Sequence, residues 1–195
     1  MSAPVTRLAT LDDVDAVVTT VAAAFAADPA WSFMLGPENL AARRSFARAL
    51  LLPRIHRGTA WLVDDGAAVA LWDRLSGVAP DDGHDTDWTA FAAEVGDLAW
   101  ARIEAYEHAI ESVAPSPPYW YLGVLATHPD LHGQGLATAV MQPGFEAAAA
   151  DGWDCWLETS TEPNKAFYER RGFRESRAVV VPGGPPTWWL RRPHV

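Results

Sequence analysis

The sequence predicts an α/β fold (of the mixed α+β kind), with helices flanking one mixed central sheet. Three observations lead to this class. Strand and helix patterns alternate along the chain, a hairpin signal surrounds Asp65-Gly66, and a long apolar strand over 119–127 leads into a glycine-rich turn and a helix. Such a strand is typical of the centre of a sheet that is covered on both faces. The length of 195 residues suits one domain over 1–195.

The N-terminal elements follow from periodicity and turn chemistry. Apolar residues recur at helical spacing from Val14 to Phe25, after the candidate cap residues Thr10 and Asp12. We expect Asp28-Pro29 to end this helix, because proline disfavours the helical conformation of the residue before it. The expected ranges are a strand over 5–9, helices over 14–25 and 39–52, and hairpin strands over 60–64 and 67–72.

The C-terminal elements alternate between strand and helix. A polar loop around 81–85 precedes a helical pattern with apolar residues from Phe91 to Ile110. Beyond this, the expected ranges are strands over 119–127, 155–160, 175–181 and 187–191, and helices over 135–150 and 164–171. The helix that joins 119–127 to 155–160 predicts that these two strands are parallel neighbours with a right-handed crossover.

Charge and cysteine content exclude several classes of protein. The formal net charge is -10, and no run of Lys or Arg supplies the basic face that binding to nucleic acid needs. No apolar run approaches the roughly 20 residues that span a membrane. Cys155 is the sole cysteine, which favours a reducing cytoplasm and a buried packing thiol. The sequence leaves monomer and homodimer open.

The stretch from Leu125 to Thr138 has the pattern of an anion-binding turn. A strand ends there, glycines stand at 133 and 135, and an Ala-rich helix begins. Glycines let a phosphate approach the backbone, and the first N–H groups of a helix and its dipole favour negative charge. The stretch lacks the Lys-Ser/Thr of a P-loop and the spacing of a dinucleotide fingerprint. A purely structural turn is the alternative.

A second motif follows, and the two together resemble a known family. Asn164, Phe167-Tyr168 and Gly172-Phe173 follow the glycine turn in the order and spacing typical of the GNAT superfamily of N-acetyltransferases. The resemblance implies the GNAT fold, whose central sheet is splayed between two strands, and acetyl-CoA as the co-substrate.

A narrower resemblance covers most of the chain. The stretches 6–14, 63–70, 157–160 and 167–170 are similar to the puromycin N-acetyltransferases of antibiotic-producing actinomycetes. The similarity fades over 73–117, a variable segment that in this fold helps to shape the acceptor pocket. A puromycin-like antibiotic is therefore a candidate acceptor, and antibiotic resistance a candidate role.

The family resemblance implies roles for individual residues. The turn is expected to bind the CoA pyrophosphate through backbone N–H groups, and the strand end to pair with the pantetheine arm. His132 stands where the family usually has Gln or Arg, and Ala137 where it often has Gly, which puts the affinity for CoA in question. The expected cofactor-binding residues are Leu125, Ala126, Thr127, His132, Gly133, Gln134, Gly135, Leu136, Ala137, Thr138 and Asn164.

Two residues are expected to move protons. Tyr168 matches the usual general acid of the family, and a Tyr hydroxyl with a pKa of about 10 can protonate a thiolate whose pKa is about 8.5. Glu158, at a strand end and on the face opposite Cys155, is the expected base for the acceptor amine. Core packing is the alternative for Tyr168, and a structural carboxylate for Glu158. Weaker candidates for the base are Glu104, Glu107 and His108.

Ten tryptophans suggest an aromatic pocket for the acceptor. The expected substrate-binding residues are Trp31 and Phe33, which follow the Asp28-Pro29 break, and Trp120; Trp88 and Trp100 are further candidates. Core and rim packing is the alternative for each ring. The acidic run over 81–87 lacks the spacing of a calcium or zinc site, so no metal is expected.

The sequence thus predicts an enzyme that moves an acetyl group from acetyl-CoA to a primary amine of a small molecule, by direct attack in a ternary complex. Two alternatives remain open: an acetyltransferase for protein N-termini or lysines, and a non-catalytic acyl-CoA sensor. The shape of the acceptor site distinguishes the first alternative from the predicted enzyme, because an open groove favours peptides and a closed aromatic pocket favours small molecules.

Overall fold

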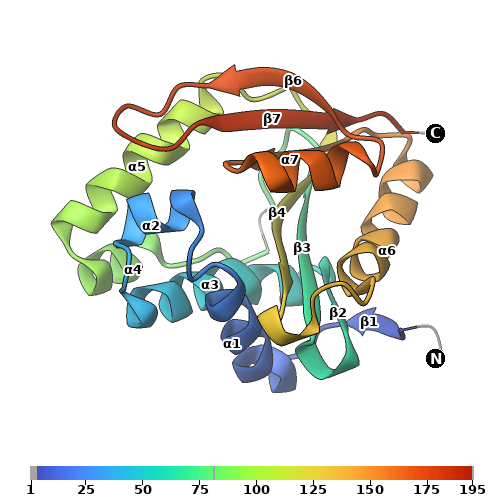
Figure 1. Cartoon of the computed structure of the whole chain (residues 1–195), viewed down its shortest axis with the longest axis horizontal. Coiled ribbons are helices and arrows are strands. Elements are labelled where there is room, and N and C mark those ends of the chain that lie inside the picture. The colour runs from blue at the N-terminus through green and yellow to red at the C-terminus, as the bar shows by residue number, and fades with distance from the viewer. Residues whose placement is uncertain (1–3, 81, 195) are drawn as a thin grey trace.

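One mixed sheet of seven strands organises the computed structural model, which describes residues 4–80 and 82–194 (Figure 1). The strand order is β1-β2-β3-β4-β5-β7-β6. Helices cover both faces of the sheet, which confirms the predicted α/β class. The strands are β1 (Thr6–Leu8), β2 (Ala60–Val63), β3 (Ala68–Leu75), β4 (Tyr119–Thr127), β5 (Cys155–Thr159), β6 (Arg174–Val179) and β7 (Thr187–Arg192). The helices are α1 (Val14–Ala24), α2 (Pro29–Leu35), α3 (Leu40–His56), α4 (Trp88–Val95), α5 (Asp97–Glu111), α6 (Leu136–Asp151) and α7 (Glu162–Glu169).

Strand pairing is antiparallel everywhere except between β4 and β5, which are parallel. The α6 helix joins these two strands, as the sequence predicted. Both predicted hairpins are confirmed, β2 with β3 and β6 with β7. The turn of the first hairpin places Asp64 and Asp65 at positive φ, 44° and 53°, a conformation that Asp tolerates better than most residues.

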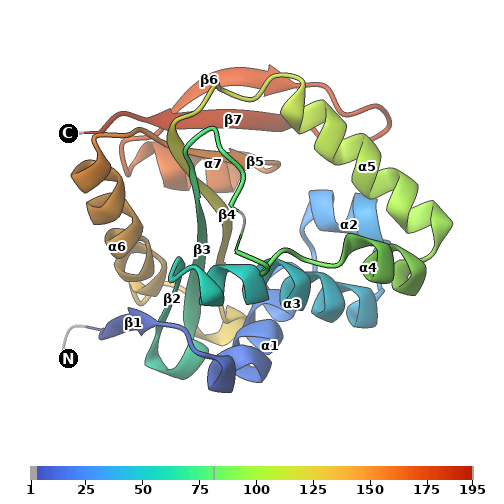
Figure 2. The same ribbon diagram turned by 180° about the vertical axis from the view of Figure 1, so that it is seen from behind.

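Two layers of helices enclose the sheet. On one face, Phe145 of α6, Tyr168 of α7 and Phe173 pack together. On the other face α1 and α3 pack against the sheet, and α2, α4 and α5 extend this layer (Figure 2). Trp72 of β3 is fully buried under α6, where a Cβ on Gly144 would lie 2.2 Å from its indole. Glycine at 144 is therefore what lets α6 approach the sheet this closely.

The sheet opens between β4 and β5. Their ladder holds the pairs Trp120 with Cys155 and Tyr121 with Trp156, although β4 continues to Thr127. On its other side β4 pairs with β3, except that Gly123 is an extra residue in the ladder. A bulge of this kind bends its strand and increases the local twist. Beyond Tyr121, β4 therefore has no ladder with β5 within the described chain.

Asp28-Pro29 starts a helix and does not simply end one, which corrects the sequence prediction. The Asp28 carboxylate caps α2 by accepting hydrogen bonds from the N–H groups of Ala30 and Trp31, at 2.9 and 3.0 Å. Pro29 occupies the first helical position, where a backbone N–H has no intrahelical partner in any case.

The helical pattern within 73–117 forms two helices, α4 and α5, with Gly96 between them. None of the helices in the described ranges is by itself long and apolar enough to cross a membrane. One bent pair, Leu11–Ala24 with Pro29–Leu35, meets the length and composition criteria jointly, across a bend of 104°.

Candidate active site

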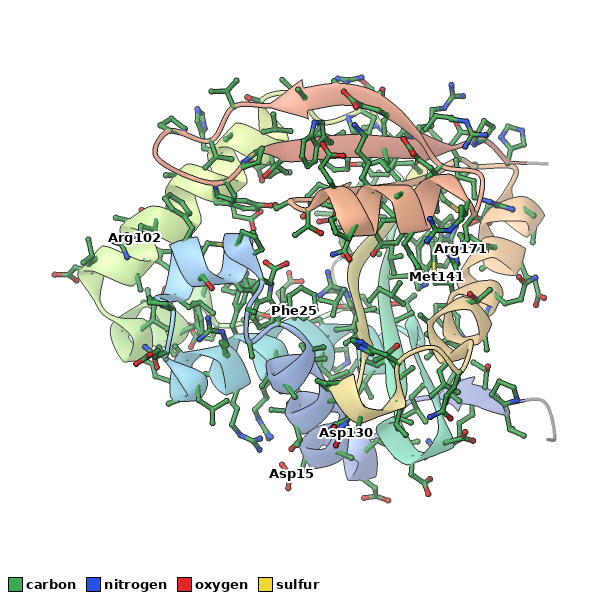
Figure 3. All side chains as sticks on the ribbon, in the orientation of Figure 1. Asp15, Phe25, Arg102, Asp130, Met141 and Arg171 are labelled. Carbon is green, nitrogen blue, oxygen red and sulfur yellow. The ribbon has the colours of Figure 1, made fainter. Side chains whose placement is uncertain are left out.

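A cavity of about 550 Å³ reaches from the opening between β4 and β5 to the helical layer. Its lining residues include members of β3, β4, β5, β7, α2, α3, α4, α5 and α7, so segments far apart in the sequence meet there. Phe25, which Figure 3 labels near the centre of the molecule, lies on its wall. The variable segment 73–117 supplies part of this wall through α4 and α5.

Aromatic rings form much of the cavity wall. Trp31 packs against two of them, with ring centroids 4.5 Å from Phe25 and 5.0 Å from Phe46. The aromatic lining residues are Phe25, Trp31, Phe46, Trp88, Trp100, Tyr106, Tyr119, Tyr121, Tyr168 and Trp189. Trp31 and the two further candidates on α4 and α5 thus lie on the cavity wall, in line with the predicted aromatic pocket.

Trp120 lies outside this lining, so its predicted role in acceptor binding is wrong. Side chains alternate along a strand, and Tyr119 and Tyr121 face the cavity while Trp120 faces α6. The Trp120 indole packs near Trp72, with centroids 6.5 Å apart, and donates a hydrogen bond to Asp151 at 2.8 Å. Because β4 is apolar on both faces, its sequence does not reveal which set of side chains faces the cavity.

Phe33 also lies outside the cavity lining, which corrects the second acceptor prediction. Its ring is near Gly184 in the loop between β6 and β7, where a Cβ would lie 3.5 Å from it. Trp31 and Phe33 are two residues apart on α2, and residues at this spacing point to nearly opposite sides of a helix.

Glu158 projects from β5 into the cavity, and Cys155 and Leu157 lie in the core on the opposite face, as strand alternation predicted. Its Oε2 accepts a hydrogen bond from the Tyr121 hydroxyl at 2.6 Å. Burial raises the pKa of Glu158 to about 7; the bond from Tyr121 opposes this rise and the charge of Glu107 adds to it. A carboxyl that titrates near neutral pH suits a proton acceptor.

Three glutamates of α5 add negative charge to the cavity. Glu104, Glu107 and Glu111 are spaced three and four residues apart, so they share one face of the helix, and all three line the cavity. The protein atoms around Glu107 raise its pKa although its side chain still reaches solvent through the cavity, and the neighbouring Glu111 adds to the shift. His108 is not among the lining residues, which removes it as a candidate base.

Arg54 of α3 is the one basic side chain among the lining residues of the described chain. It is 8% exposed, pairs with Asp73, and donates from Nη1 to the Leu50 carbonyl at 2.5 Å, while its Nε has no hydrogen-bond partner. A Cβ on Gly123 would lie 3.0 Å from the guanidinium. Glycine in the β4 bulge therefore leaves room for this cation. No sequence pattern indicates that Arg54 belongs to the site.

Tyr168 lies between the core and the cavity. Its ring packs against Phe167 and Phe173, with centroids 5.3 and 5.7 Å away, and it also lines the cavity. Burial, followed by the charges of Glu158 and Asp28, raises the pKa of the hydroxyl above its usual value, so it keeps its proton at neutral pH. Asn164 lies one helical turn earlier on α7 and also lines the cavity.

The turn before α6 has the backbone geometry of an anion site. Gly133 and Gly135 both adopt a φ of 80°, and Gly135 is the N-cap of the helix. The backbone N–H groups from 133 to 138 donate to no backbone acceptor within the described ranges. His132 Nε2 lies 3.2 Å from the Thr127 carbonyl oxygen, so this side chain ties the turn to the end of β4.

Arg171 borders this turn and was not predicted as a site residue; Figure 3 shows it between α7 and α6. Its Nε and Nη2 donate to Thr138 Oγ1 at 3.0 and 2.5 Å, and its Nη1 donates to the Phe167 carbonyl at 2.7 Å. The guanidinium also stacks on the Phe167 ring, 3.4 Å from its centroid. Arg171 thus brings positive charge to the start of α6.

Comparison with known proteins finds a matching family model and similar folds. Residues 87–175 match the family model described as acetyltransferase (GNAT) domain. A structure described as histone acetyltransferase HPA2 and related acetyltransferase, from Corynebacterium glutamicum, is 22% identical; the match covers 100% of this chain and 98% of that one, with a TM-score of 0.67.

Two insect enzymes have the same architecture. The polyamine N-acetyltransferase of Drosophila melanogaster is 16% identical, with a TM-score of 0.70 over 98% of this chain and 100% of that one. Arylalkylamine N-acetyltransferase 2 of Aedes aegypti is 14% identical, with a TM-score of 0.68 over 97% of this chain and 98% of that one. At these identities the likeness concerns the fold. The chain shares the fold of these acetyltransferases, and residues 87–175 match the model of the GNAT acetyltransferase domain.

Proposed function

We propose that this enzyme transfers an acetyl group from acetyl-CoA to the primary amine of a small aromatic molecule. The observation that carries the proposal is the cavity itself. It runs from the open edge of β4, past Tyr168 and Asn164, into an acidic chamber walled by aromatic rings. We also infer a single domain over 1–195, because lining residues extend from Phe25 to Trp189.

The chain offers acetyl-CoA a fitting site. The free N–H groups from 133 to 138 suit the pyrophosphate, with Arg171 beside them. The unpaired edge of β4 from Leu125 to Thr127 suits the amides of the pantetheine arm, which would add to the sheet as an extra strand does. Acetyl-CoA supplies the activated thioester, and the remaining chemistry belongs to side chains.

Glu158 is the proposed general base. An alkylamine arrives protonated at neutral pH and must lose a proton before its nitrogen can attack. Glu158 faces the cavity and has a pKa of about 7, so much of it is ionised at pH 7 and able to take that proton. Glu104 and Glu107 attract the cation to the chamber and are the second choice for the base.

Tyr168 is the proposed general acid. Its hydroxyl keeps its proton at neutral pH and lies on the cavity wall near the open edge of β4. It donates that proton to the sulfur as the carbon–sulfur bond breaks. The backbone N–H groups along the opened part of β4 are the proposed donors to the oxyanion.

Direct attack by the amine, without an acetyl-enzyme, is supported by the position of Cys155. The thiol is 1% exposed and lies in the core, on the face of β5 opposite Glu158. Burial raises its pKa to about 12, so it carries almost no thiolate at neutral pH.

The acceptor class follows from the lining of the chamber. Six carboxylates, one guanidinium and ten aromatic side chains favour a cationic molecule with an aromatic body. The cavity of about 550 Å³ has the size of a small-molecule site, which favours a small molecule over a peptide. Enzymes named for polyamines and arylalkylamines share the fold. A puromycin-like amine remains a candidate through the sequence resemblance.

The direct test is acetyl-CoA-dependent release of free thiol with a panel of amines: an arylalkylamine, a polyamine, puromycin and a lysine peptide. We expect the aromatic amines to support the fastest release. A preference for the peptide would contradict the acceptor class. Thiol release with none of the amines, by protein that binds CoA, would favour the sensor.

A further inference from the structure

The hydrogen bond between Tyr121 and Glu158 spans the opening of the sheet. Tyr121 belongs to the β4–β5 pair that stands last before the strands separate, opposite Trp156. Glu158 lies two residues farther along β5, on the same side of the strand as Trp156. The bond therefore links β4 and β5 just beyond the end of their backbone ladder.

The surroundings hold the tyrosine in place. Its ring packs near Trp189 of β7, with centroids 5.7 Å apart. A Cβ on Gly123 would lie 3.1 Å from the ring, so the bulge leaves room for it. Burial and the charge of Glu158 keep the pKa of the Tyr121 hydroxyl well above its usual value, so the hydroxyl remains a donor across the working pH range.

We propose that Tyr121 is a positioning residue: its hydroxyl holds Oε2 of Glu158, so that Oε1 takes the proton of the acceptor amine. The inference rests on the proposed role of Glu158 as the base. In the transfer, the amine N–H bond breaks and the proton moves to Oε1. The nitrogen lone pair then bonds the acyl carbon, and the sulfur leaves with a proton from Tyr168. The second proton of the attacking nitrogen goes to the Tyr168 oxygen as the amide forms, and Glu158 releases its proton to solvent. Tyr121 keeps its own proton throughout.

Several ionisable groups face Glu158 from the surrounding elements. They are Tyr119 and Tyr121 on β4, Tyr106 and Glu107 on α5, Arg54 on α3 and Tyr168 on α7. Of the side chains in the described ranges, Tyr121 is the one that donates a hydrogen bond to the carboxylate. Arg54 favours the charged form of Glu158, and Glu107 disfavours it.

The test is the pH dependence of kcat/KM in the full chain, with Tyr121→Phe as the variant and Tyr119→Phe as the matched control. Tyr119 lies on the same face of the same strand and lines the same cavity, but makes no bond to Glu158. Without the Tyr121 hydroxyl, the charged form of Glu158 loses a partner. In Tyr121→Phe we expect the acid limb of the profile, where kcat/KM falls at low pH, to shift to higher pH by about one unit. A shift of this size is what loss of a hydrogen bond to a charged group implies. The limb should stay in place in Tyr119→Phe.

Glu158→Gln distinguishes failure of the positioning role of Tyr121 from failure of the proposed role of Glu158 as the base. Suppose that Glu158→Gln loses both the activity and the fall of kcat/KM at low pH, while Tyr121→Phe keeps the wild-type pH profile. Glu158 is then supported as the base, and the positioning role of Tyr121 is overturned. If Glu158→Gln keeps both, the base assignment fails and the inference falls with it. Should Tyr121→Phe fail to fold, fluorotyrosine at position 121 replaces it. This residue retains the ring and donates more strongly, so the limb should move to lower pH, and an unmoved limb overturns the inference.

Discussion

The proposed site has two ends that differ in construction: a cofactor end at the open edge of β4 and the turn before α6, and an acceptor end in the cavity. The cofactor end consists mainly of backbone: the open edge of β4, two glycines at positive φ and the free N–H groups that begin α6. The acceptor end consists of side chains from α2, α3, α4 and α5, most of them aromatic or acidic. Backbone groups bind a phosphate whatever the neighbouring side chains, whereas the acceptor end changes its selectivity with each substitution. Variants at the two ends should therefore separate CoA binding from acceptor binding.

Substitution of Tyr168, which lies where the two ends meet, should have the largest effect on the catalytic rate. Tyr168→Phe removes the proposed proton donor and keeps the ring that packs on Phe173. We expect kcat to fall about 100-fold, the lower range for a lost general acid, while the affinity for CoA stays unchanged. Steady-state kinetics and calorimetry with CoA measure the two quantities. An unchanged kcat would leave Tyr168 as a core aromatic only.

The next largest effect should be the change of kcat/KM with pH. Glu158 must be ionised to accept a proton, and burial raises its pKa to about 7. Below that pH the carboxyl is protonated in free enzyme, so kcat/KM should fall about tenfold for each further unit of pH. A profile that stays flat from pH 5 to 8, with an amine whose own ionisation is accounted for, would argue for a water-mediated route.

Glu107→Gln should change only the acceptor end. Loss of one carboxylate from the acidic wall should raise KM for a cationic amine about tenfold and leave CoA affinity unchanged. Asp97→Asn is the matched control, because it removes the same charge from the same helix at an exposed position outside the cavity lining. Equal shifts in both variants would mean that net charge, not the wall, attracts the amine.

Arg171→Ala should change only the cofactor end. The guanidinium lies at the N-terminus of α6, where it adds to the attraction of a pyrophosphate, so its loss should weaken CoA binding about fivefold. The KM for the amine should not change. Arg170→Ala removes the neighbouring exposed charge and serves as the control. If both variants weaken binding equally, the hydrogen bonds of Arg171 to the turn are not what matters.

Cys155→Ala should have the smallest effect on catalysis. The buried thiol takes no part in direct transfer, so kcat should remain near the wild-type value. A stability loss of about 1 kcal/mol is expected from the small cavity left in the core. A folded variant that has lost activity would instead indicate an acetyl-enzyme.

The contrast between the ends also explains what the sequence could predict. The glycine turn, the parallel β4–β5 pair and the facing of Glu158 follow from local patterns. They are set by glycine conformation, by crossover handedness and by strand alternation. Asp28-Pro29 carried a start signal as well as a stop signal, since Asp favours the N-cap and Pro the first helical position.

The residues of the acceptor end could not be predicted fully, because their positions depend on how several strands and helices pack together. Both faces of β4 are apolar, and the bulge at Gly123 changes which side chains share a face, so the sequence does not show that Trp120 faces α6. Arg54 and Arg171 become site residues only through contacts with Asp73 and Thr138, which come from distant parts of the chain.

The proposed function depends most on the backbone N–H groups of one turn, which hold the cofactor. Titration of CoA into isotopically labelled protein, followed through assigned amide resonances, tests it most directly. We expect saturable shifts that are largest for the amides of 133–138, with smaller shifts along 125–127. Saturable binding that leaves the amides of 133–138 unmoved would contradict it.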